Sequence, residues 1–316
     1  MVDETLDKGS ACTLGDVNKR PKNCIKITDY DNWEEGFSLS SLRLESASEV
    51  EYARWLRSQG HQVKEHRGRY WKKRFGFFEP VHWMAELFED EIGSSCKKCW
   101  GYRAALKKES AHIANGSLPL HLHRNVPDYG AHLLCKTRRW DLRKCLKFVE
   151  IKPISNPKVL HEDGFEIFKN NFERTHYGKR LSKDKFCQDV NNYFDFPFIS
   201  VLGGFIDKEL VAYLVTLIVE DTAYLDTIIM NDQARLLQAC TGLQFAMMKH
   251  LGSKHPGIGQ VVDGLHAREN SLLCKYKEKW GFHVSKIPSL HWFLPGIGPV
   301  IKKAWPHKYY RLTGVE

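Results

Sequence analysis

The sequence predicts a mixed α/β (α+β) fold in which helices flank a mostly antiparallel sheet. Residues 198–206, 210–219 and 223–230 form three apolar runs that are separated by very short polar turns. Strands joined by turns this short pair with their neighbours in antiparallel fashion. A long amphipathic helix and a strand–helix–strand segment follow this meander, so helices must cover the sheet.

The first half of the chain predicts a smaller set of helices and strands. Residues 1–35 lack periodicity and are expected to form a flexible arm. A serine-rich start and apolar residues at helical spacing predict a helix from Ser46 to Gly60. The next segments read as two strands within 62–78, a basic helix at 138–147 and a strand at 148–154.

The second half is more regular. Two helices are expected near 161–176 and 182–195, the second capped by Ser182. After the three-strand meander, Asp232 is expected to cap one long helix that reaches Leu251. The remaining elements are predicted as a strand at 260–263, a helix at 267–279, a strand at 282–286 and a last strand at 308–312.

Composition narrows the class of protein. The 316 residues include 42% hydrophobic and 27% charged residues, which is typical of a globular chain. The longest apolar run has ten residues, too few for the ~20 that span a bilayer, and no signal peptide is evident. We therefore expect a cytoplasmic protein with no membrane insertion. The net charge of +9 favours an anionic partner or serves solubility alone.

One segment of the second half resembles a known signature. The predicted order β-β-β-α-β-α-β resembles the GNAT acetyltransferase fold. Asn270 and the pair Gly281-Phe282 resemble the GNAT signature, in which a tyrosine lies seven positions after the asparagine. Here Lys277 occupies that position and Tyr276 precedes it.

The departure at this position is similar to the FemAB-like branch. An aromatic–lysine pair such as Tyr276-Lys277, three residues before an aromatic–glycine pair, is typical of that branch. The basic segment 136–144 and the segment 181–186 are also similar to FemAB-like proteins. The resemblance implies a GNAT-like acyltransferase domain at 156–316, preceded at 36–155 by a degenerate GNAT-like α+β domain.

Three residues are catalytic candidates, and for Lys277 the resemblance implies the role. Lys277 would stabilise the oxyanion that develops as an acyl carbonyl is attacked. Tyr276 is its neighbour in the motif. Asp263, at the end of an apolar strand, is a candidate general base, and it is equally a candidate helix cap. For Lys277 the alternative is a solvated lysine on an amphipathic helix.

Three further residues are cofactor-binding candidates. Asn270 would bind a pantetheine-like arm or orient the following helix, Asp226 is a further candidate carboxylate, and Arg235 could attract a pyrophosphate. Ordinary GNAT proteins bind that pyrophosphate on a glycine-rich turn. This chain has Asp232 and no glycine there, which favours the FemAB-like branch and leaves dependence on CoA open.

These observations predict transfer of an acyl or aminoacyl group to an amine or hydroxyl. Direct attack is expected, because the chain has no nucleophile-elbow serine motif. Acyl-CoA, such as acetyl-CoA, is the favoured donor and aminoacyl-tRNA the second. The acceptor would be a small or nucleotide-linked molecule. A non-catalytic binding module with this fold and an RNA-binding protein are the alternatives.

Two other clusters were weighed. Cys96-x-x-Cys99 and His121-x-His123 do not have zinc-finger spacing, and no second Cys-x-x-Cys exists, so no metal is predicted. The basic helix presents Trp140 among arginines and lysines (Arg138, Arg139, Arg143, Lys144). This face would hold phosphates, or it would pack Trp140 inward while its charges reach solvent.

Overall fold

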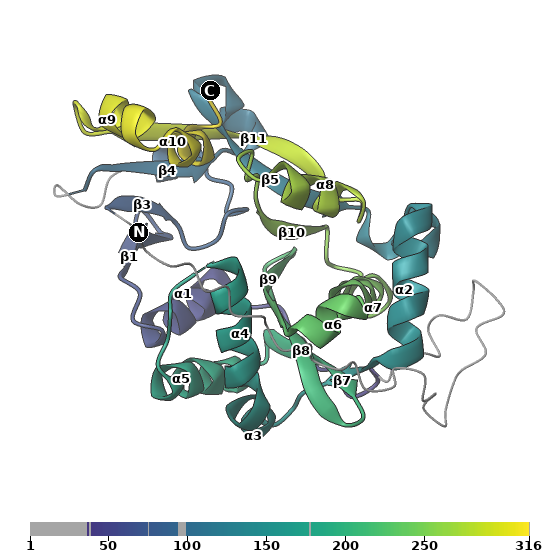
Figure 1. The fold of residues 1–316 in the computed structure, drawn as a ribbon. Helices are drawn as coiled ribbons and strands as arrows, with labels where there is room; N and C mark the ends of the chain where they lie inside the picture. The colour runs from purple at the N-terminus through teal and green to yellow at the C-terminus, as the bar shows by residue number, and fades with distance from the viewer. Residues whose placement is uncertain (1–36, 38, 75, 94–98, 177, 316) are drawn as a thin grey trace, which may run out of the picture.

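The computed structural model describes residues 37, 39–74, 76–93, 99–176 and 178–315, and the arm predicted at 1–35 lies outside them (Figure 1). The described strands form one sheet of 11 strands, in the order β1-β2-β3-β4-β11-β5-β10-β9-β8-β7-β6. Among these, only the pairs β3–β4 and β9–β10 are parallel. The predicted fold class, a mostly antiparallel sheet flanked by helices, is confirmed.

The first half begins with a helix and continues into strands. Its elements are α1 (Glu49–Ser58), β1 (Val63–His66), β2 (Arg69–Arg74), β3 (Phe77–Pro80), β4 (Gly101–Ala105) and β5 (Gly116–Arg124). Ser48 caps α1 in a capping box with Glu51, as expected for a serine three residues before a glutamate. The two strands predicted within 62–78 are confirmed as β1 and β2, which form a hairpin that turns at Arg67 and Gly68, both at positive φ.

The middle of the chain follows the predicted pattern closely. It contains α2 (Lys136–Phe148), β6 (Glu150–Pro153), α3 (Pro157–Val159), α4 (Phe165–Thr175), α5 (Lys183–Phe194), β7 (Ile199–Ile206), β8 (Glu209–Val219) and β9 (Thr222–Met230). The Ser182 side chain accepts a hydrogen bond from the Lys185 backbone, which confirms the predicted cap of α5. β7, β8 and β9 pair as the predicted antiparallel meander.

Two predictions for the last third are wrong. The elements there are α6 (Asp232–Leu236), α7 (Ala239–Lys254), β10 (Gln260–Leu265), α8 (Ser271–Glu278), β11 (His283–Phe293), α9 (Ile297–Ala304) and α10 (Pro306–Thr313). The long helix is broken, because Gln238 has a left-handed φ of 60°, and Asn231 rather than Asp232 is its cap. Residues 308–312 are helical: Pro306 favours a helix start, and Tyr310 and Thr313 are buried on one side of α10.

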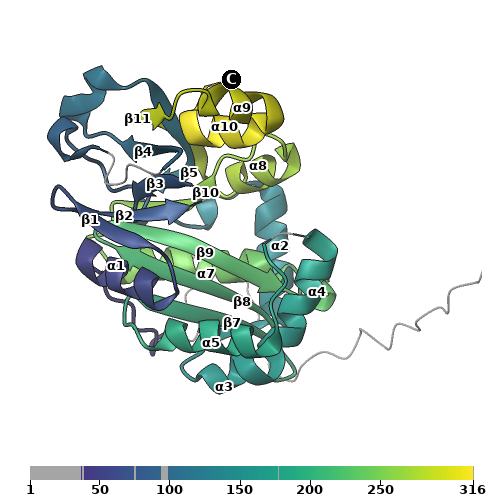
Figure 2. The same cartoon turned by 90° about the vertical axis from the view of Figure 1, so that its left-hand side faces the viewer.

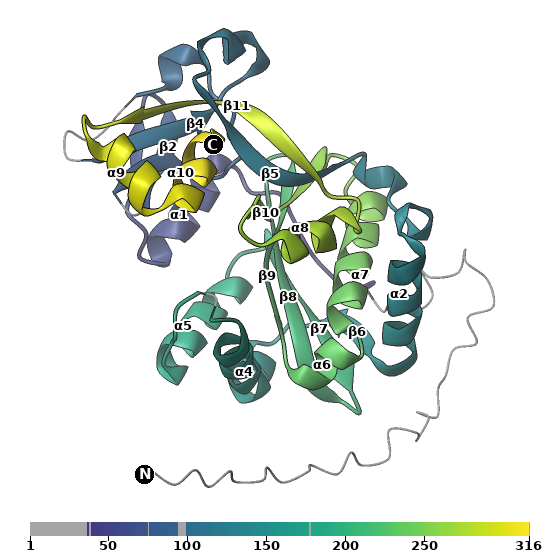
Figure 3. The same cartoon turned by 45° about the horizontal axis from the view of Figure 1, so that its top comes forward.

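Helices cover both faces of the β7–β9 meander. α4 and α5 lie on one face, and α6 and α7 lie on the other with α2 packed outside α7 (Figures 2 and 3). Two apolar clusters fill the space on the two faces, one around Tyr213 and Val215 and the other around Leu214 and Leu243. α2 and α7 approach closely at Gly242, where an added Cβ would lie 2.4 Å from Cys145 Sγ.

Strands from both halves of the chain alternate in the sheet. β11 lies between β4 and β5, and β5 lies between β11 and β10. β5 therefore connects the strands of the first half to the meander through continuous backbone pairing. Across the described residues, no helix is both long enough and apolar enough to cross a bilayer.

Candidate active site

β9 and β10 separate at one defined point, which we call the β9–β10 divergence. Their parallel pairing runs from Gln260↔Thr222 to Val262↔Tyr224 and stops there. Beyond it, Asp226 is the extra residue of a bulge in β9, because the β8–β9 register shifts around it. β10 has its own irregularity against β5 before Leu265. The bulges redirect both strands and leave backbone groups of β9 and β10 unpaired with each other.

Lys277 lies at this divergence. Its Nζ is 3.2 Å from Asp263 Oδ1 and also donates a hydrogen bond to the Asp263 carbonyl oxygen. The two side chains are only 11% and 14% exposed, whereas Lys275 and Lys279 on the same helix are exposed. The alternative of a solvated lysine therefore does not hold for Lys277.

Asp263 and Lys277 form a largely desolvated ion pair. Burial raises the pKa of Asp263, and this effect outweighs the nearby Lys277 ammonium, which lowers it. A carboxylate with a raised pKa accepts a proton more readily than one in water. The pair therefore places a cation at the β9–β10 divergence, where the Asp263 carboxylate holds it in position.

Tyr276 faces away from this pair. Its hydroxyl donates a hydrogen bond to Gln244 Oε1 at 2.8 Å and lies 2.9 Å from Cys240 Sγ, both on α7. The Arg138 guanidinium lies 4.4 Å from the centre of its ring. Burial raises its pKa well above the ordinary value. Tyr276 thus anchors α8 to α7 and α2, and a catalytic role for it stays a prediction.

Asp226 lies on the other strand of the divergence. Its side chain is exposed and 2.9 Å from the Thr227 hydroxyl, yet surrounding protein raises its pKa by displacing water. The Lys72 ammonium of β2 lowers the same pKa, so a cation from the first half of the chain acts on Asp226.

Lys72 belongs to a buried charge cluster that the sequence did not reveal. Its Nζ donates to the Val81 carbonyl at 2.9 Å and lies 3.8 Å from Glu79, which binds the Arg103 guanidinium at 2.6 Å. These cations lower the pKa of Glu79 to about 2, although burial alone would raise it. The three residues lie on three different short strands, β2, β3 and β4, so no local sequence pattern marks them as a cluster.

The predicted cofactor-binding residues are engaged locally. Asn270 Oδ1 accepts a hydrogen bond from the Leu273 backbone at 3.0 Å, so this side chain caps α8, a role that was not predicted for it from the sequence. Arg235 lies 3.3 Å from the exposed Asp232 carboxylate at the start of α6, and Arg174 lies 3.8 Å from it. Their binding of a cofactor stays a prediction.

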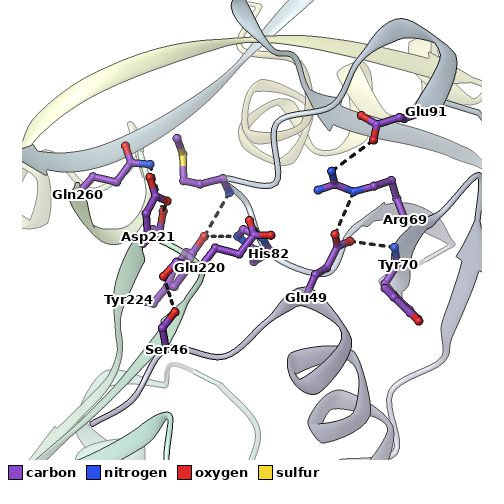
Figure 4. Close-up of polar contacts among 12 residues, drawn as sticks. Ser46, Glu49, Arg69, Tyr70, His82, Glu91, Glu220, Asp221, Tyr224 and Gln260 are labelled. Atoms are coloured by element: carbon purple, nitrogen blue, oxygen red, sulfur yellow. Dashed lines mark hydrogen bonds and ion pairs between the residues drawn. The ribbon is translucent and has the colours of Figure 1, made fainter. Parts of the chain in front are cut away.

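A second set of polar contacts fixes the start of the divergence (Figure 4). Tyr224 is the last residue of β9 that pairs with β10. Its hydroxyl accepts a hydrogen bond from the Met84 backbone at 3.2 Å and lies 2.9 Å from His82 Nδ1. His82 Nε2 lies 3.4 Å from Glu220, and this contact lowers the pKa of Glu220. The segment around His82 is thereby attached to the turn between β8 and β9.

The basic helix α2 has an inner and an outer side. Arg138 points inward, where it binds Asp141 at 2.9 Å and covers the Tyr276 ring. Trp140 is 56% exposed, and Lys144 Nζ lies 5.5 Å from the centre of its ring. The expectation that α2 packs Trp140 inward is therefore wrong, since Arg138 takes the inner position.

Solved structures with the same architecture were found. The crystal structure of FemX aligns over 81% of this chain and 93% of its own length, with 10% identity and a TM-score of 0.56. This chain therefore shares its fold with FemX. The C-terminal domain of a protein described as a lysylphosphatidylglycerol synthetase from Agrobacterium fabrum aligns over 84% of this chain and 97% of its own, with 12% identity and a TM-score of 0.54.

A third structure agrees with the FemAB-like fold. L-PGS from Bacillus licheniformis aligns over 85% of this chain and 98% of its own length, with 10% identity and a TM-score of 0.51. No protein-family model matches the sequence, and a comparison with curated proteins also gave no match. Similarity at these identities establishes the FemAB-like fold, and function has to be argued from the site.

Proposed function

We propose that this protein transfers an acyl or aminoacyl group from an activated ester or thioester to an amine or hydroxyl. The observation that carries the proposal is the desolvated Lys277–Asp263 pair at the β9–β10 divergence. A fixed cation in such a position stabilises charge that develops on a carbonyl oxygen. The FemAB-like fold, shared with the structures above, supports the same reaction class.

The reaction would proceed by direct attack. The donor acyl group would lie along unpaired backbone of β9 and β10, with its carbonyl oxygen toward Lys277 Nζ. The acceptor nitrogen or oxygen forms a bond to the acyl carbon, and the bond to the leaving sulfur or oxygen then breaks. Asp226, whose side chain is exposed, would take the acceptor proton, which finally reaches the leaving group.

Two features favour aminoacyl-tRNA over acyl-CoA as the donor. The start of α6 has no glycine-rich turn, and the exposed Asp232 would repel a pyrophosphate. The outer side of α2 presents Trp140 with Lys144, a combination that suits stacking on bases and contact with phosphates. The name lysylphosphatidylglycerol synthetase describes an aminoacylated product, which agrees with this choice.

A pair of binding experiments tests the proposal. Purified protein is titrated with CoA, acetyl-CoA and longer acyl-CoAs in thermal unfolding, and separately with aminoacyl-tRNA and uncharged tRNA. A ligand at 100 times its Kd should add about 2.7 kcal/mol of stability. We expect stabilisation by aminoacyl-tRNA that weakens steeply with salt, and weaker binding by Trp140→Ala. Stabilisation by acyl-CoA alone would assign the thioester donor instead.

A transfer assay distinguishes an enzyme from a binding module. Radiolabelled donor is incubated with pooled amine and hydroxyl acceptors, and labelled product is separated from hydrolysis products. Label that enters an acceptor with wild-type protein and not with Lys277→Ala supports transfer. Donor binding without any product, unchanged by Lys277→Ala, would support the non-catalytic alternative.

A further inference from the structure

Three potential metal ligands lie close together beside α8, the helix that carries Lys277. His121 lies on β5, Cys274 lies on α8, and His266 lies in the segment between β10 and α8. One ligand atom from each of the three residues lies within 4.8 Å of the other two. The rings of the two histidines meet edge to face, with 5.5 Å between their centres. Residues far apart in the sequence thus present two imidazoles and one thiol to one point.

His121 has the most unusual environment of the three. Its side chain is 1% exposed, and neither ring nitrogen has a hydrogen-bond partner among the described residues. Buried polar groups are nearly always hydrogen-bonded, and an exception requires an explanation such as an ion. The sequence grouped His121 with His123, but His123 Nδ1 lies 3.0 Å from the Gly281 carbonyl oxygen. Cys96 lies outside the described residues.

The other two residues are oriented for the same task. His266 Nδ1 lies 2.8 Å from the Tyr310 hydroxyl, which leaves Nε2 as the nitrogen able to bind an ion. Such a contact to the second ring nitrogen is what fixes metal-binding histidines in place. Cys274 is 6% exposed, and its thiol donates only a 3.3 Å contact to the Ala267 carbonyl oxygen.

We propose that His121, His266 and Cys274 bind one zinc ion. Two imidazoles and a thiolate suit zinc, and three protein ligands leave a fourth tetrahedral position for water. In that geometry neighbouring ligand atoms lie about 3.3–3.6 Å apart, so each of the three atoms would move by about an ångström or less. The Cys274 thiol loses its proton to the buffer as its sulfur binds the ion.

The zinc ion would attach α8 to two strands that already pair with each other through their backbones. It would connect β5 and the end of β10 to α8, the helix that carries Lys277 three residues after Cys274. Burial raises the pKa of the Cys274 thiol, while the nearby Lys277 ammonium lowers this pKa and the Glu278 carboxylate raises it. The site is separate from the proposed transfer chemistry, because none of its three ligands is assigned a role there.

Metal binding to untagged full-length protein tests the proposal. Protein stripped of metal is reconstituted with Zn²⁺ or Co²⁺, and bound metal is counted after gel filtration. We expect one tightly bound equivalent, a thiolate-to-cobalt charge-transfer band, and a zinc-dependent rise in Tm. Cys274→Ser should abolish the band, and His266→Gln should weaken binding by at least about a hundredfold. Tyr310→Phe should weaken it by about tenfold to a hundredfold.

Matched variants test whether the metal binds at this cluster or at another cysteine. Cys240→Ser removes a cysteine of α7 that contacts Tyr276, and Cys96→Ser removes one from the Cys-x-x-Cys motif. Both should keep the cobalt band, and so should Lys277→Ala, which separates this result from acyl transfer. No stoichiometric metal, or a band that survives Cys274→Ser and disappears in Cys96→Ser, would overturn the proposal.

Discussion

Lys277 Nζ lies 3.2 Å from Asp263 Oδ1, and Asp263 directly follows the last residue of β10 that pairs with β9. The contact joins α8 to β10 at this point. Lys277 is therefore held in position in the absence of substrate. Such preorganisation is what gives a fixed charge its effect on a transition state, because no reorganisation is needed during the reaction.

Replacement of this lysine should reduce catalysis more than folding. We expect Lys277→Ala to lower kcat by about 10²–10³, the usual effect of removing one oxyanion donor. The exposed Lys279 on the same helix provides the control, and Lys279→Ala should retain activity. The measurement is transfer rate at saturating donor. Equal rates for both variants would remove Lys277 from the mechanism.

The same replacement should cost stability through Asp263. The carboxylate would lose its partner while remaining 14% exposed, at a cost of about 1–3 kcal/mol in the free energy of unfolding. The double variant Lys277→Met/Asp263→Asn should recover most of this loss and remain inactive. Urea denaturation of the wild type and both variants measures the effect. A double variant as unstable as Lys277→Ala would contradict the explanation.

Asp226→Asn should lower the transfer rate without lowering the stability of the protein. If Asp226 takes the acceptor proton, its loss should slow transfer by about 10²–10⁴. Because its folded pKa is raised, the folded state binds more protons, and the charged carboxylate opposes folding as the pH rises through that raised value. Asn should therefore keep or slightly raise the Tm at pH 7. Asp207→Asn, in the exposed turn before β8, is the control.

Glu79 should make the protein sensitive to acid. Its pKa is lowered from 4.5 to about 2 in the folded state, so its stabilising contribution is complete above pH 4.5 and disappears as the pH falls toward 2. Glu79→Gln removes this dependence and leaves Arg103 without its buried partner, at a cost of about 3–5 kcal/mol. Unfolding curves between pH 2 and 5 measure the pH dependence of the free energy of unfolding. Glu65→Gln, at an exposed position, should change neither this pH dependence nor the stability at neutral pH.

The contact between α2 and α7 predicts a packing effect. Gly242→Ala would place a methyl group 2.4 Å from Cys145 Sγ and 2.6 Å from Ile151 Cδ1, both buried. Overpacking of this kind costs about 1–3 kcal/mol. Gly257→Ala is the matched control, since no atom lies within 4 Å of its added Cβ. A neutral Gly242→Ala would mean that the helices separate easily.

Local patterns predicted the elements that depend on neighbouring residues. The meander of β7, β8 and β9 has continuous apolar runs and short turns, and Ser182 caps α5 as its type and position indicate. The helix break at Gln238 was missed, because no glycine or proline marks it. The last strand was wrong, since the aromatic residues of 308–312 fit a helix that packs on β5 equally well.

The site required contacts that no local pattern encodes. A motif marked Lys277 and a strand end marked Asp263, but the sequence did not predict that the two side chains form a pair. Lys72, His82 and Tyr224 were missed, because their partners are supplied by distant segments of the chain. His121 was noticed only for its spacing from His123, and its actual neighbours come from beyond residue 260.

The position of β5 between β11 and β10 constrains how the chain is made. During synthesis, β4 and β5 emerge long before residue 283, so the edges that pair with β11 wait until residues 283–293 have left the ribosome. Unpaired strand edges bind other chains readily, and pairing between distant segments is slow. A nascent chain or a fragment that stops before β11 therefore keeps these edges unpaired, and we expect truncation at that point to give an aggregation-prone product.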